Sequence, residues 1–172
     1  MDISEMSNNS LQILEELKNR DHSSEIVNVD EDVVKIVIVS VMGGKFAFYG
    51  SDVKEILSEC EIYWIPGVPE YIPGLINVRG DIESVIDIRS IISSSSYDAN
   101  KWQIVMAQKD DFRSGIIVDW VEDVIDIPAS AFSKQITSLE GTGNDVFSGE
   151  ISIENSMIPL LDIGKLAAKI MP

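Results

Sequence analysis

The sequence predicts an all-β domain, on the strength of three observations. Short runs of β-branched and other apolar residues recur from Val33 onward, each bounded by Gly, Pro, Asn or Asp. The centre of the chain almost lacks the apolar spacing of an amphipathic helix. One hairpin pattern also occurs twice at a constant spacing, which indicates an internal duplication.

The first copy of that hairpin is predicted within residues 69–89, with the sequence P-E-Y-I-P-G-L-I-N-V-R-G-D-I-E-S-V-I-D-I-R. Two apolar segments, 75–78 and 82–88, flank the tripeptide Arg79-Gly80-Asp81. Gly80 can supply the positive φ that a tight turn between two strands requires. The prolines stand before the hairpin, where a missing N–H group does not interrupt strand pairing.

The repeat extends beyond the hairpin. Residues 74–88 align without a gap on residues 149–163 at an offset of 75, with Arg79-Gly80 opposite Glu154-Asn155. Residues 35–39 and 53–57 align on residues 103–107 and 121–125 at an offset of 68. The second copy is therefore longer in its middle, and Asn155 can adopt the left-handed conformation nearly as readily as Gly.

The other elements follow from the same signals. Further strands are expected at 33–41, 45–49, 51–57, 102–107, 114–118 and 121–127. In the segment 51–57, the residues Val53, Ile56 and Leu57 are expected to point inward, and Lys54 and Glu55 outward. Short helices are expected at 88–92 and 164–170, where Asp87 and Asp162 would act as N-caps.

Residues 1–32 differ in composition and are interpreted as a polar, acidic N-terminal tail with a short amphipathic helix at 10–20. Residues 33–170 form the folded domain, with internal copies at about 33–92 and 101–170. The serines at 93–96 are interpreted as the linker between the copies, and residues 141–145 as a flexible loop.

The charge and the cysteine content limit the classes of partner and the cellular compartment that we expect. The chain has 29 acidic and 13 basic residues and a formal charge of −16, which argues against nucleic acid and anionic membranes as partners. A single cysteine suits a reducing compartment. The start of the chain does not resemble a secretion signal, and the longest apolar stretch, 33–42, is too short to span a bilayer. We expect a cytoplasmic protein without direct membrane insertion.

The chain is poor in catalytic groups. Its only histidine, His22, lies in the tail, which removes a Ser-His-Asp or Cys-His arrangement from the folded part. One His and one Cys do not suffice for a zinc site, and Gly141-Thr142-Gly143 lacks the lysine of a phosphate-binding loop. We expect no enzyme, no cofactor and no metal, although a hydrolase with two carboxylates stays open.

The hairpin sequence resembles the signature of the CheW-like domain, the adaptor domain of bacterial and archaeal chemotaxis. In that family a Gly-x-x-Asn-x-Arg-Gly turn precedes an apolar strand that ends in Asp-Leu-Arg, as G-L-I-N-V-R-G and D-I-R do here. Residues 52–56, 115–124 and 149–163 are similar to other parts of the family pattern. Ser84 departs from it, because the family usually has Pro there, whereas the second copy keeps Pro159.

The resemblance implies two five-stranded SH3-like barrels packed together around an apolar core, with an exchange of edge elements possible. It also implies a non-catalytic adaptor. Such adaptors bind the regulatory domain of a chemotaxis histidine kinase through the first barrel, and the cytoplasmic tip of a chemoreceptor through a groove near the barrel junction. An adaptor in a related pathway, such as one governing pili, and an unrelated duplicated β-barrel enzyme are the alternatives.

The candidate kinase and receptor interface centres on the hairpin tip. Arg79 is expected to form an ion pair with Glu55 that fixes the tip for docking, while Asn77 and Gly80 shape the turn. Four further positions match family positions associated with partner contact: Val53, Gly74, Gly115 and Val121. The aromatic pair Tyr63 and Trp64 would suit an interface if exposed, but we expect it to be buried between the barrels.

Overall fold

The computed structural model describes residues 31–58, 60–93, 101–139 and 144–171. The helix expected at 10–20, most of the serine linker and the first three residues of the loop expected at 141–145 lie outside these residues. The end of that loop, 144–145, belongs to a one-turn 3-10 helix rather than to a flexible loop. The described strands are β1 (Val33–Val41), β2 (Gly44–Tyr49), β3 (Val53–Leu57), β4 (Tyr63–Trp64), β5 (Gly74–Val78), β6 (Asp81–Asp87), β7 (Gln103–Lys109), β8 (Phe112–Val118), β9 (Trp120–Pro128), β10 (Phe132–Ser133), β11 (Phe147–Ile153) and β12 (Ser156–Leu161). The helices are α2 (Arg89–Ile92), α3 (Ile163–Ile170) and the one-turn 3-10 helices η1 (Gly50–Asp52), η2 (Ala129–Ala131) and η3 (Asn144–Val146).

The strands form two six-stranded sheets, here called sheet A and sheet B. Sheet A has the order β10-β11-β12-β2-β1-β9, and sheet B has the order β3-β7-β8-β6-β5-β4. The predicted all-β class is confirmed. Each sheet has six strands where five were expected, because the two-residue strands β4 and β10 extend the hairpins β5–β6 and β11–β12. The sheets are open, since neither pair of edge strands is joined by a ladder in the described structure.

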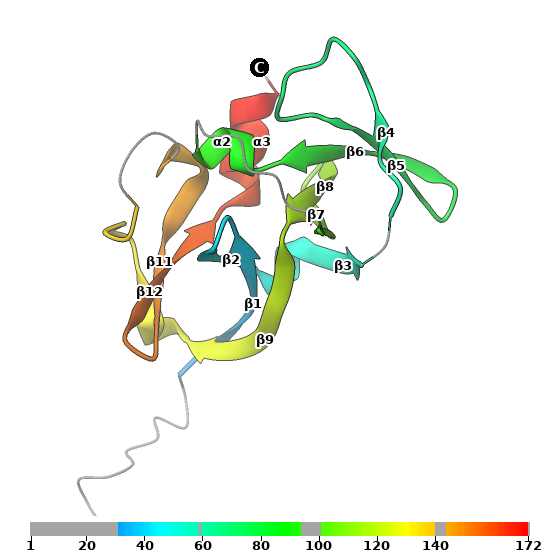
Figure 1. Ribbon diagram of the computed structural model, residues 1–172. Coiled ribbons are helices and arrows are strands. Elements are labelled where there is room, and N and C mark those ends of the chain that lie inside the picture. The colour runs from blue at the N-terminus through cyan, green and yellow to red at the C-terminus, as the bar shows by residue number, and fades with distance from the viewer. Residues whose placement is uncertain (1–30, 59, 94–100, 140–143, 172) are drawn as a thin grey trace, which may run out of the picture. The chain divides into compact units, whose positions relative to one another are not determined.

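Each sheet combines strands from both halves of the chain (Figure 1). In sheet A, β12 pairs in parallel with β2, so that Leu160 lies opposite Ala47. In sheet B, β6 pairs in parallel with β8, so that Val85 lies opposite Gly115. These two pairings are equivalent, because residues of the first half match residues of the second at offsets of 68 and 75.

The same offsets relate the other ladders, including their irregularities. Pairing of β1 with β9 places Val39 opposite Val121, and pairing of β7 with β3 places Ala107 opposite Val53. Each ladder has a bulge at that point, between the same equivalent positions. A position in one sheet can therefore be compared directly with its counterpart in the other.

Three apolar clusters fill the fold. One lies against sheet A around Ile36, Ile151 and Leu160, and one lies against sheet B around Ile76 and Ile104. The third and largest draws residues from both sheets and from helix α3. Burying each large aliphatic side chain contributes about 1.5–3 kcal/mol, so these clusters are the main source of stability.

The predicted orientation along β3 is wrong at two positions. Ile56 is 38 % exposed, whereas Glu55 is half-buried. Burial alternates strictly along this strand, because successive side chains of a strand point to opposite faces. Glu55 therefore shares a face with Val53 and Leu57, and Ile56 shares the outer face with Lys54.

The two predicted helical turns are present, but only one has the predicted cap. Asp162 is the N-cap of α3, where its Oδ1 accepts the Lys165 N–H at 3.1 Å. At α2 the N-cap is Ile88, which has no side-chain acceptor. Asp87 instead accepts the Arg89 backbone N–H at 3.0 Å and forms an ion pair with the Arg89 guanidinium at 2.7 Å.

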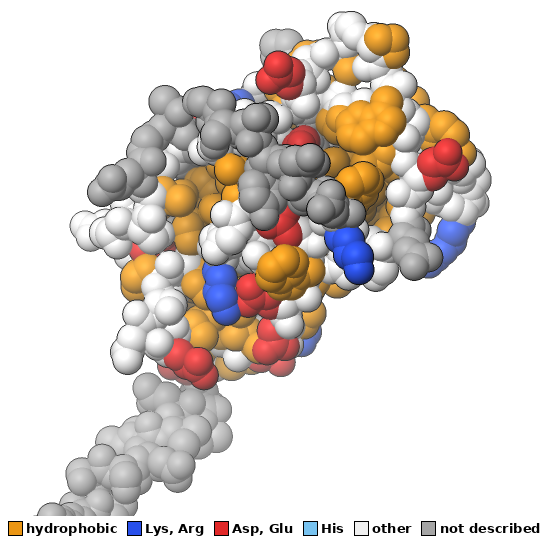
Figure 2. Space-filling model, viewed as in Figure 1, with side chains coloured by type: hydrophobic (Ala, Val, Ile, Leu, Met, Phe, Trp, Pro, Cys, Tyr) orange, Lys and Arg blue, Asp and Glu red, His pale blue; other side chains and the backbone are white. Residues whose placement is uncertain are grey.

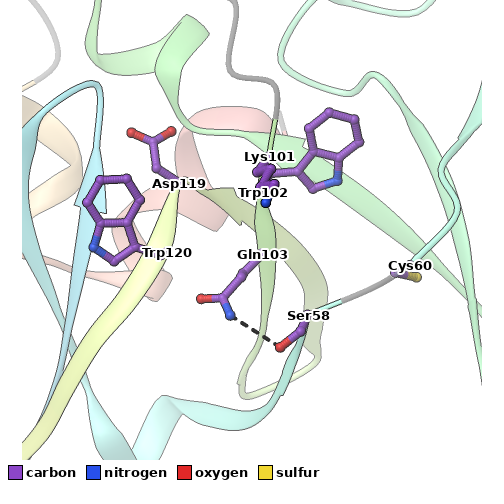
Figure 3. A pocket seen from close by; sticks show the side chains of 7 residues that line it. All are labelled: Ser58, Cys60, Lys101, Trp102, Gln103, Asp119 and Trp120. Atoms are coloured by element: carbon purple, nitrogen blue, oxygen red, sulfur yellow. Dashed lines mark hydrogen bonds between the residues drawn. The ribbon is translucent and has the colours of Figure 1, made fainter.

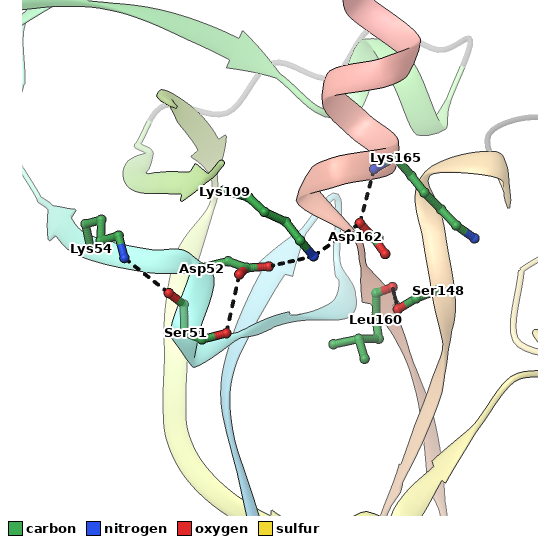
Figure 4. A network of polar contacts seen from close by, with 8 residues as sticks. All are labelled: Ser51, Asp52, Lys54, Lys109, Ser148, Leu160, Asp162 and Lys165. Atoms are coloured by element: carbon green, nitrogen blue, oxygen red, sulfur yellow. Dashed lines mark hydrogen bonds and ion pairs between the residues drawn. The ribbon is translucent and has the colours of Figure 1, made fainter. Parts of the chain in front are cut away.

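A lysine links the turn between β7 and β8 to two other elements (Figure 4). Lys109 Nζ lies 3.6 Å from Asp52 Oδ2 in η1 and 3.7 Å from Asp162 Oδ1 at the start of α3. The ammonium group also lies 6.0 Å from the centre of the Tyr49 ring. Asp52 is buried, and its Oδ2 has no hydrogen-bond partner in the described structure, so Lys109 supplies the compensating charge.

Candidate functional site

The tip of the β5–β6 hairpin is a two-residue turn in which both central residues have positive φ. Arg79 has φ 55° and Gly80 has φ 102°, the arrangement that matches the twist of a hairpin. Asn77 Oδ1 accepts the Gly80 N–H at 2.8 Å, which confirms the structural role expected for both residues. The hairpin β11–β12 has the same turn, with Glu154 at φ 46° and Asn155 at φ 65°.

The predicted ion pair at this tip is present. Arg79 Nη2 lies 2.9 Å from Glu55 Oε2, which joins the turn to the edge strand β3. The Arg79 side chain is 83 % exposed, whereas that of Glu55 is 22 % exposed. The guanidinium group is thus oriented by a partly buried carboxylate and still presents most of its donors to solvent.

Val53 and Val121 occupy equivalent bulge positions at the edges of the two sheets. Each is half-buried and packs against the largest apolar cluster. Part of each side chain therefore remains accessible on an edge strand. Val53 lies on β3 of sheet B and Val121 on β9 of sheet A, so the candidate residues are distributed over both sheets.

Gly74 and Gly115 are buried, and each is a glycine for a steric reason. A Cβ atom at Gly74 would lie 2.4 Å from the Tyr63 carbonyl oxygen, which is closer than real Cβ contacts allow. At Gly115 it would lie 2.6 Å from Ile104 Cγ2. Both positions support the sheet, so a substitution there would affect any surface indirectly through the backbone.

The aromatic pair before the hairpin is exposed, contrary to our expectation of burial between the barrels. Tyr63 is 55 % exposed and Trp64 is 63 % exposed. The strand β4 has only two residues and pairs only with β5, so at the sheet edge no further strand covers these rings. Apolar side chains gather on the visible face over this part of sheet B, beside the loop that joins β4 to β5 (Figure 2).

A pocket of about 520 Å³ lies between the end of β3, the start of β7 and the start of β9 (Figure 3). Its lining residues are Ser58, Cys60, Lys101, Trp102, Gln103, Asp119 and Trp120. Gln103 Oε1 accepts the Val121 N–H at 2.6 Å, and its Nε2 donates to Ser58 Oγ at 3.2 Å. This one side chain therefore connects β9 of sheet A to β7 and the end of β3 in sheet B.

Asp119 and Cys60 contribute a carboxylate and a thiol to the lining of this pocket. Asp119 Oδ2 accepts the Met42 N–H at 2.7 Å and so supports the turn between β1 and β2. Partial burial raises the pKa of the Cys60 thiol, which keeps it protonated at neutral pH. Sequence reasoning did not find Gln103, Asp119 or Trp120, because a pocket formed by elements far apart in sequence leaves no local motif.

Ser84, the residue that departs from the family pattern, lies in an intact β5–β6 hairpin. Ser84 and Ser114 share a hydrogen bond of 2.9 Å between their hydroxyl groups, across the parallel pair β6 and β8. A proline at position 84 could not make this contact. The hydroxyl pair thus takes the place of the ring that the pattern usually supplies.

The described residues include no group of three His, Cys, Asp or Glu side chains that could hold a metal ion. Within the same part of the chain, no helix has the length and apolar character needed to cross a bilayer. The structure presents three surface features that are suited to binding: a preoriented arginine, exposed aromatic rings and a pocket at the boundary of the two sheets. Such features define a binding domain with paired β-sheets.

The comparison with known families gives this class a name. The family model of the CheW-like domain matches residues 35–171, and the chain belongs to this family. The chain is 26 % identical over 136 residues to the chemotaxis protein CheW of Bacillus subtilis, covering 78 % of this chain and 87 % of that protein. It is 30 % identical over 101 residues to the protein PilI of Pseudomonas aeruginosa, covering 58 % of this chain and 57 % of PilI.

A solved structure agrees with the family assignment. The crystal structure of the scaffolding protein TtCheW from Thermoanaerobacter tengcongensis superposes with a TM-score of 0.69 at 27 % sequence identity. The match covers 77 % of this chain and 90 % of TtCheW. The resemblance inferred from the hairpin sequence is thereby confirmed.

Proposed function

We propose that this protein is a non-catalytic adaptor of chemotaxis signalling that couples the cytoplasmic tips of chemoreceptors to the regulatory domain of a histidine kinase. Membership of the CheW-like family supports the adaptor class. The proposed place of action is the cytoplasm, at receptor arrays on the inner face of the membrane, which the protein reaches through its partners. No cofactor is part of this proposal.

The observation that carries the proposal is the exposed guanidinium of Arg79. Its backbone is fixed in a tight turn, and Glu55 orients its side chain from β3. A side chain held in its binding geometry loses little conformational entropy when it docks. Arg79 is therefore suited to form a bidentate contact with a carboxylate of the kinase domain.

The neighbouring surface extends this proposed contact. Glu55, Asn77 and Gly80 hold the tip, and Val53 adds an accessible apolar group on β3. The exposed rings of Tyr63 and Trp64 add anchors of the kind that contribute most to protein interfaces. We assign these residues to the kinase-binding surface.

The receptor tip is proposed to bind at the boundary of the two sheets. The pocket beside Val121 is lined by Trp102 and Trp120 and is spanned by Gln103. Gly115, buried in the adjacent strand β8, keeps this region in place. A groove that combines two tryptophan rings with polar and charged side chains suits an amphipathic helix of a receptor.

A related signalling pathway is the second candidate. The similarity to PilI of Pseudomonas aeruginosa favours it, because that relative is matched at 30 % identity over 101 residues. The same surfaces would then serve a kinase and receptor of a pathway that governs pili.

The proposal is tested by calorimetric titration of the protein with the kinase regulatory domain from the same source, and separately with a receptor tip fragment. Arg79→Glu is expected to weaken kinase binding about tenfold or more, since it places an acid beside Glu55 and removes the donor fork. Lys134→Glu, an exposed cation on the other sheet, makes the same charge change and is expected to bind like the natural protein. No binding to either chemotaxis partner would redirect the proposal to the pilus pathway.

A further inference from the structure

A second pocket, of about 350 Å³, lies at the end of sheet A beside the turn of the β11–β12 hairpin. Its walls are isoleucines, including the buried Ile38 and Ile158. Its rim has one cation, Lys45, and three acids, Glu122, Asp123 and Glu154, among the described residues. The pocket therefore combines an apolar wall with an excess of negative charge.

Only one of the three acids forms an ion pair in the described structure. Lys45 Nζ lies 2.6 Å from Glu122 Oε2, and this contact raises the pKa of Lys45, with a smaller electrostatic contribution from Glu154. In the described part of the chain no cation lies within ion-pair distance of Asp123 or Glu154. Asp123 Oδ1 accepts the neighbouring Val124 N–H at 2.8 Å, and its other oxygen has no hydrogen-bond partner among the described residues.

The equivalent end of sheet B shows what such a site can hold. By the offsets that relate the ladders, Asp123 corresponds to Glu55 and Glu154 corresponds to Arg79. In sheet B, the arginine of the turn places its guanidinium 2.9 Å from Glu55. In sheet A, a glutamate stands at the position of that arginine, so the counterpart of Glu55 lacks its cation.

The two sheet ends also differ in the charge of one wall residue. The end of sheet B contains a second ion pair, in which Arg113 Nε lies 2.8 Å from Glu83 Oε1. At the position that corresponds to Glu83, sheet A has Ile158. Where sheet B has a charged side chain, the pocket of sheet A thus has an isoleucine in its wall, which suits the methylene stem of a long basic side chain.

We propose that this pocket binds an arginine side chain displayed on a turn of a partner protein. The guanidinium would pair with Asp123 and Glu154, and its stem would lie against the isoleucine walls. Arginine fits better than lysine, because its planar donor fork can engage two carboxylates at once. The inference goes beyond the adaptor function and does not depend on which pathway the protein serves.

The partner is a protein other than a second copy of this chain. The formal charge of −16 opposes the approach of two identical molecules. A partner with a basic turn is attracted to the same surface. Association through this pocket should therefore weaken as the salt concentration rises.

The test is an NMR titration of the isotope-labelled protein with a cyclic β-hairpin peptide that has neutral strands and an Arg-Gly turn. The amide signals of Lys45, Asp123 and Glu154 are expected to shift and to saturate. A matched peptide with citrulline in place of arginine keeps the shape and removes the charge, and it should bind about tenfold more weakly or not at all. Equal binding of the two peptides, or no shifts at these amides, would overturn the proposal.

Two variants locate the site. Glu154→Arg recreates the arrangement of sheet B, so its own guanidinium should occupy the pocket and abolish peptide binding. Asp123→Asn should reduce binding without adding bulk, whereas Glu70→Arg, with the same charge change as Glu154→Arg on a distant exposed loop, should not abolish it. If the same amides shift with protein concentration alone, the occupant is a second copy and a different partner is ruled out.

Discussion

Arg79 Nη2 and Glu55 Oε2 lie 2.9 Å apart, although the strand order of sheet B separates β3 from the β5–β6 hairpin by β7 and β8. The ion pair therefore bridges two parts of a curled sheet that share no backbone ladder. Because the arginine is largely exposed, the pair adds little to stability. Its effect is to fix the position of the hairpin tip relative to the edge strand.

Reversal of this ion pair separates its two roles. Arg79→Glu is expected to lower the free energy of unfolding by less than about 1 kcal/mol, as for other exposed pairs. Kinase binding should fall much further, and the double variant Glu55→Arg with Arg79→Glu should recover part of it. Urea denaturation and calorimetry measure the two effects. A double variant that binds no better than either single one would show that the orientation of the tip is unimportant.

Gly74 should prove essential to the fold rather than to contact with a partner. Gly74→Ala places a Cβ atom against the Tyr63 carbonyl oxygen and is expected to cost about 3 kcal/mol of stability. Gly67→Ala is the control: its φ is +82° but nothing lies within 4 Å of an added Cβ, so about 1 kcal/mol is expected. Urea denaturation gives both values, and any loss of kinase binding by Gly74→Ala should accompany its loss of stability. A stable Gly74→Ala protein that fails to bind would contradict this view.

Glu150 makes the stability depend on pH. Burial favours its neutral form, but the N–H groups of Ser138 and Thr137 outweigh burial and lower the pKa of Glu150 from its usual 4.5. The unfolded chain thus takes up the proton at higher pH than the folded one. The stabilisation is complete above pH 4.5 and is lost as the pH falls through the lower folded-state pKa.

Glu150→Gln is therefore expected to cost about 2 kcal/mol at pH 7, because it weakens three charge-assisted hydrogen bonds in a buried site, from the N–H groups of Thr137 and Ser138 and from the Thr137 hydroxyl. It should also flatten the loss of stability between pH 5 and pH 3 that urea denaturation measures in the natural protein. Glu70→Gln, which changes an exposed carboxylate outside the ion pairs of the described structure, serves as the control. An unchanged pH profile in Glu150→Gln would show that other carboxylates cause the acid sensitivity.

Lys109 is expected to stabilise the protein through Asp52. Lys109→Met keeps most of the side-chain volume but leaves the buried Asp52 carboxylate without a cation, at a cost of about 2–3 kcal/mol. Asp52→Asn in the Lys109→Met background should restore much of that loss, since it removes the unpaired charge. A double-mutant cycle from thermal unfolding tests this coupling, and strictly additive effects would argue against it.

Much of the fold follows from local sequence signals. The turn at Arg79-Gly80 and its counterpart at Glu154-Asn155 were predicted, because residues that tolerate positive φ mark hairpins directly. The Arg79–Glu55 contact was predicted from the family resemblance, and its geometry agrees. The exposure of Tyr63 and Trp64 was not predicted, since a short edge strand looks the same in sequence whether or not another element covers it.

The two pockets could not be predicted from the sequence, for a different reason. Gln103 gives no signal in sequence, because its importance comes from two contacts, with Ser58 and Val121, that only the assembled sheets create. The acidic pocket likewise requires the equivalence of Asp123 with Glu55 to be known in three dimensions. The orientation of Ile56 was wrong because a strand at the sheet edge needs no inward-facing apolar residue at every expected position.

The mixing of strands from both halves of the chain has a consequence for biosynthesis. Strands β1 and β2 leave the ribosome long before their neighbour β12 is made. Sheet A therefore cannot be completed until β12 has been synthesised, and long-range strand pairing of this kind is slow. The nascent chain should hold apolar strands exposed during this interval, which makes it a natural client for chaperones that bind unfolded segments.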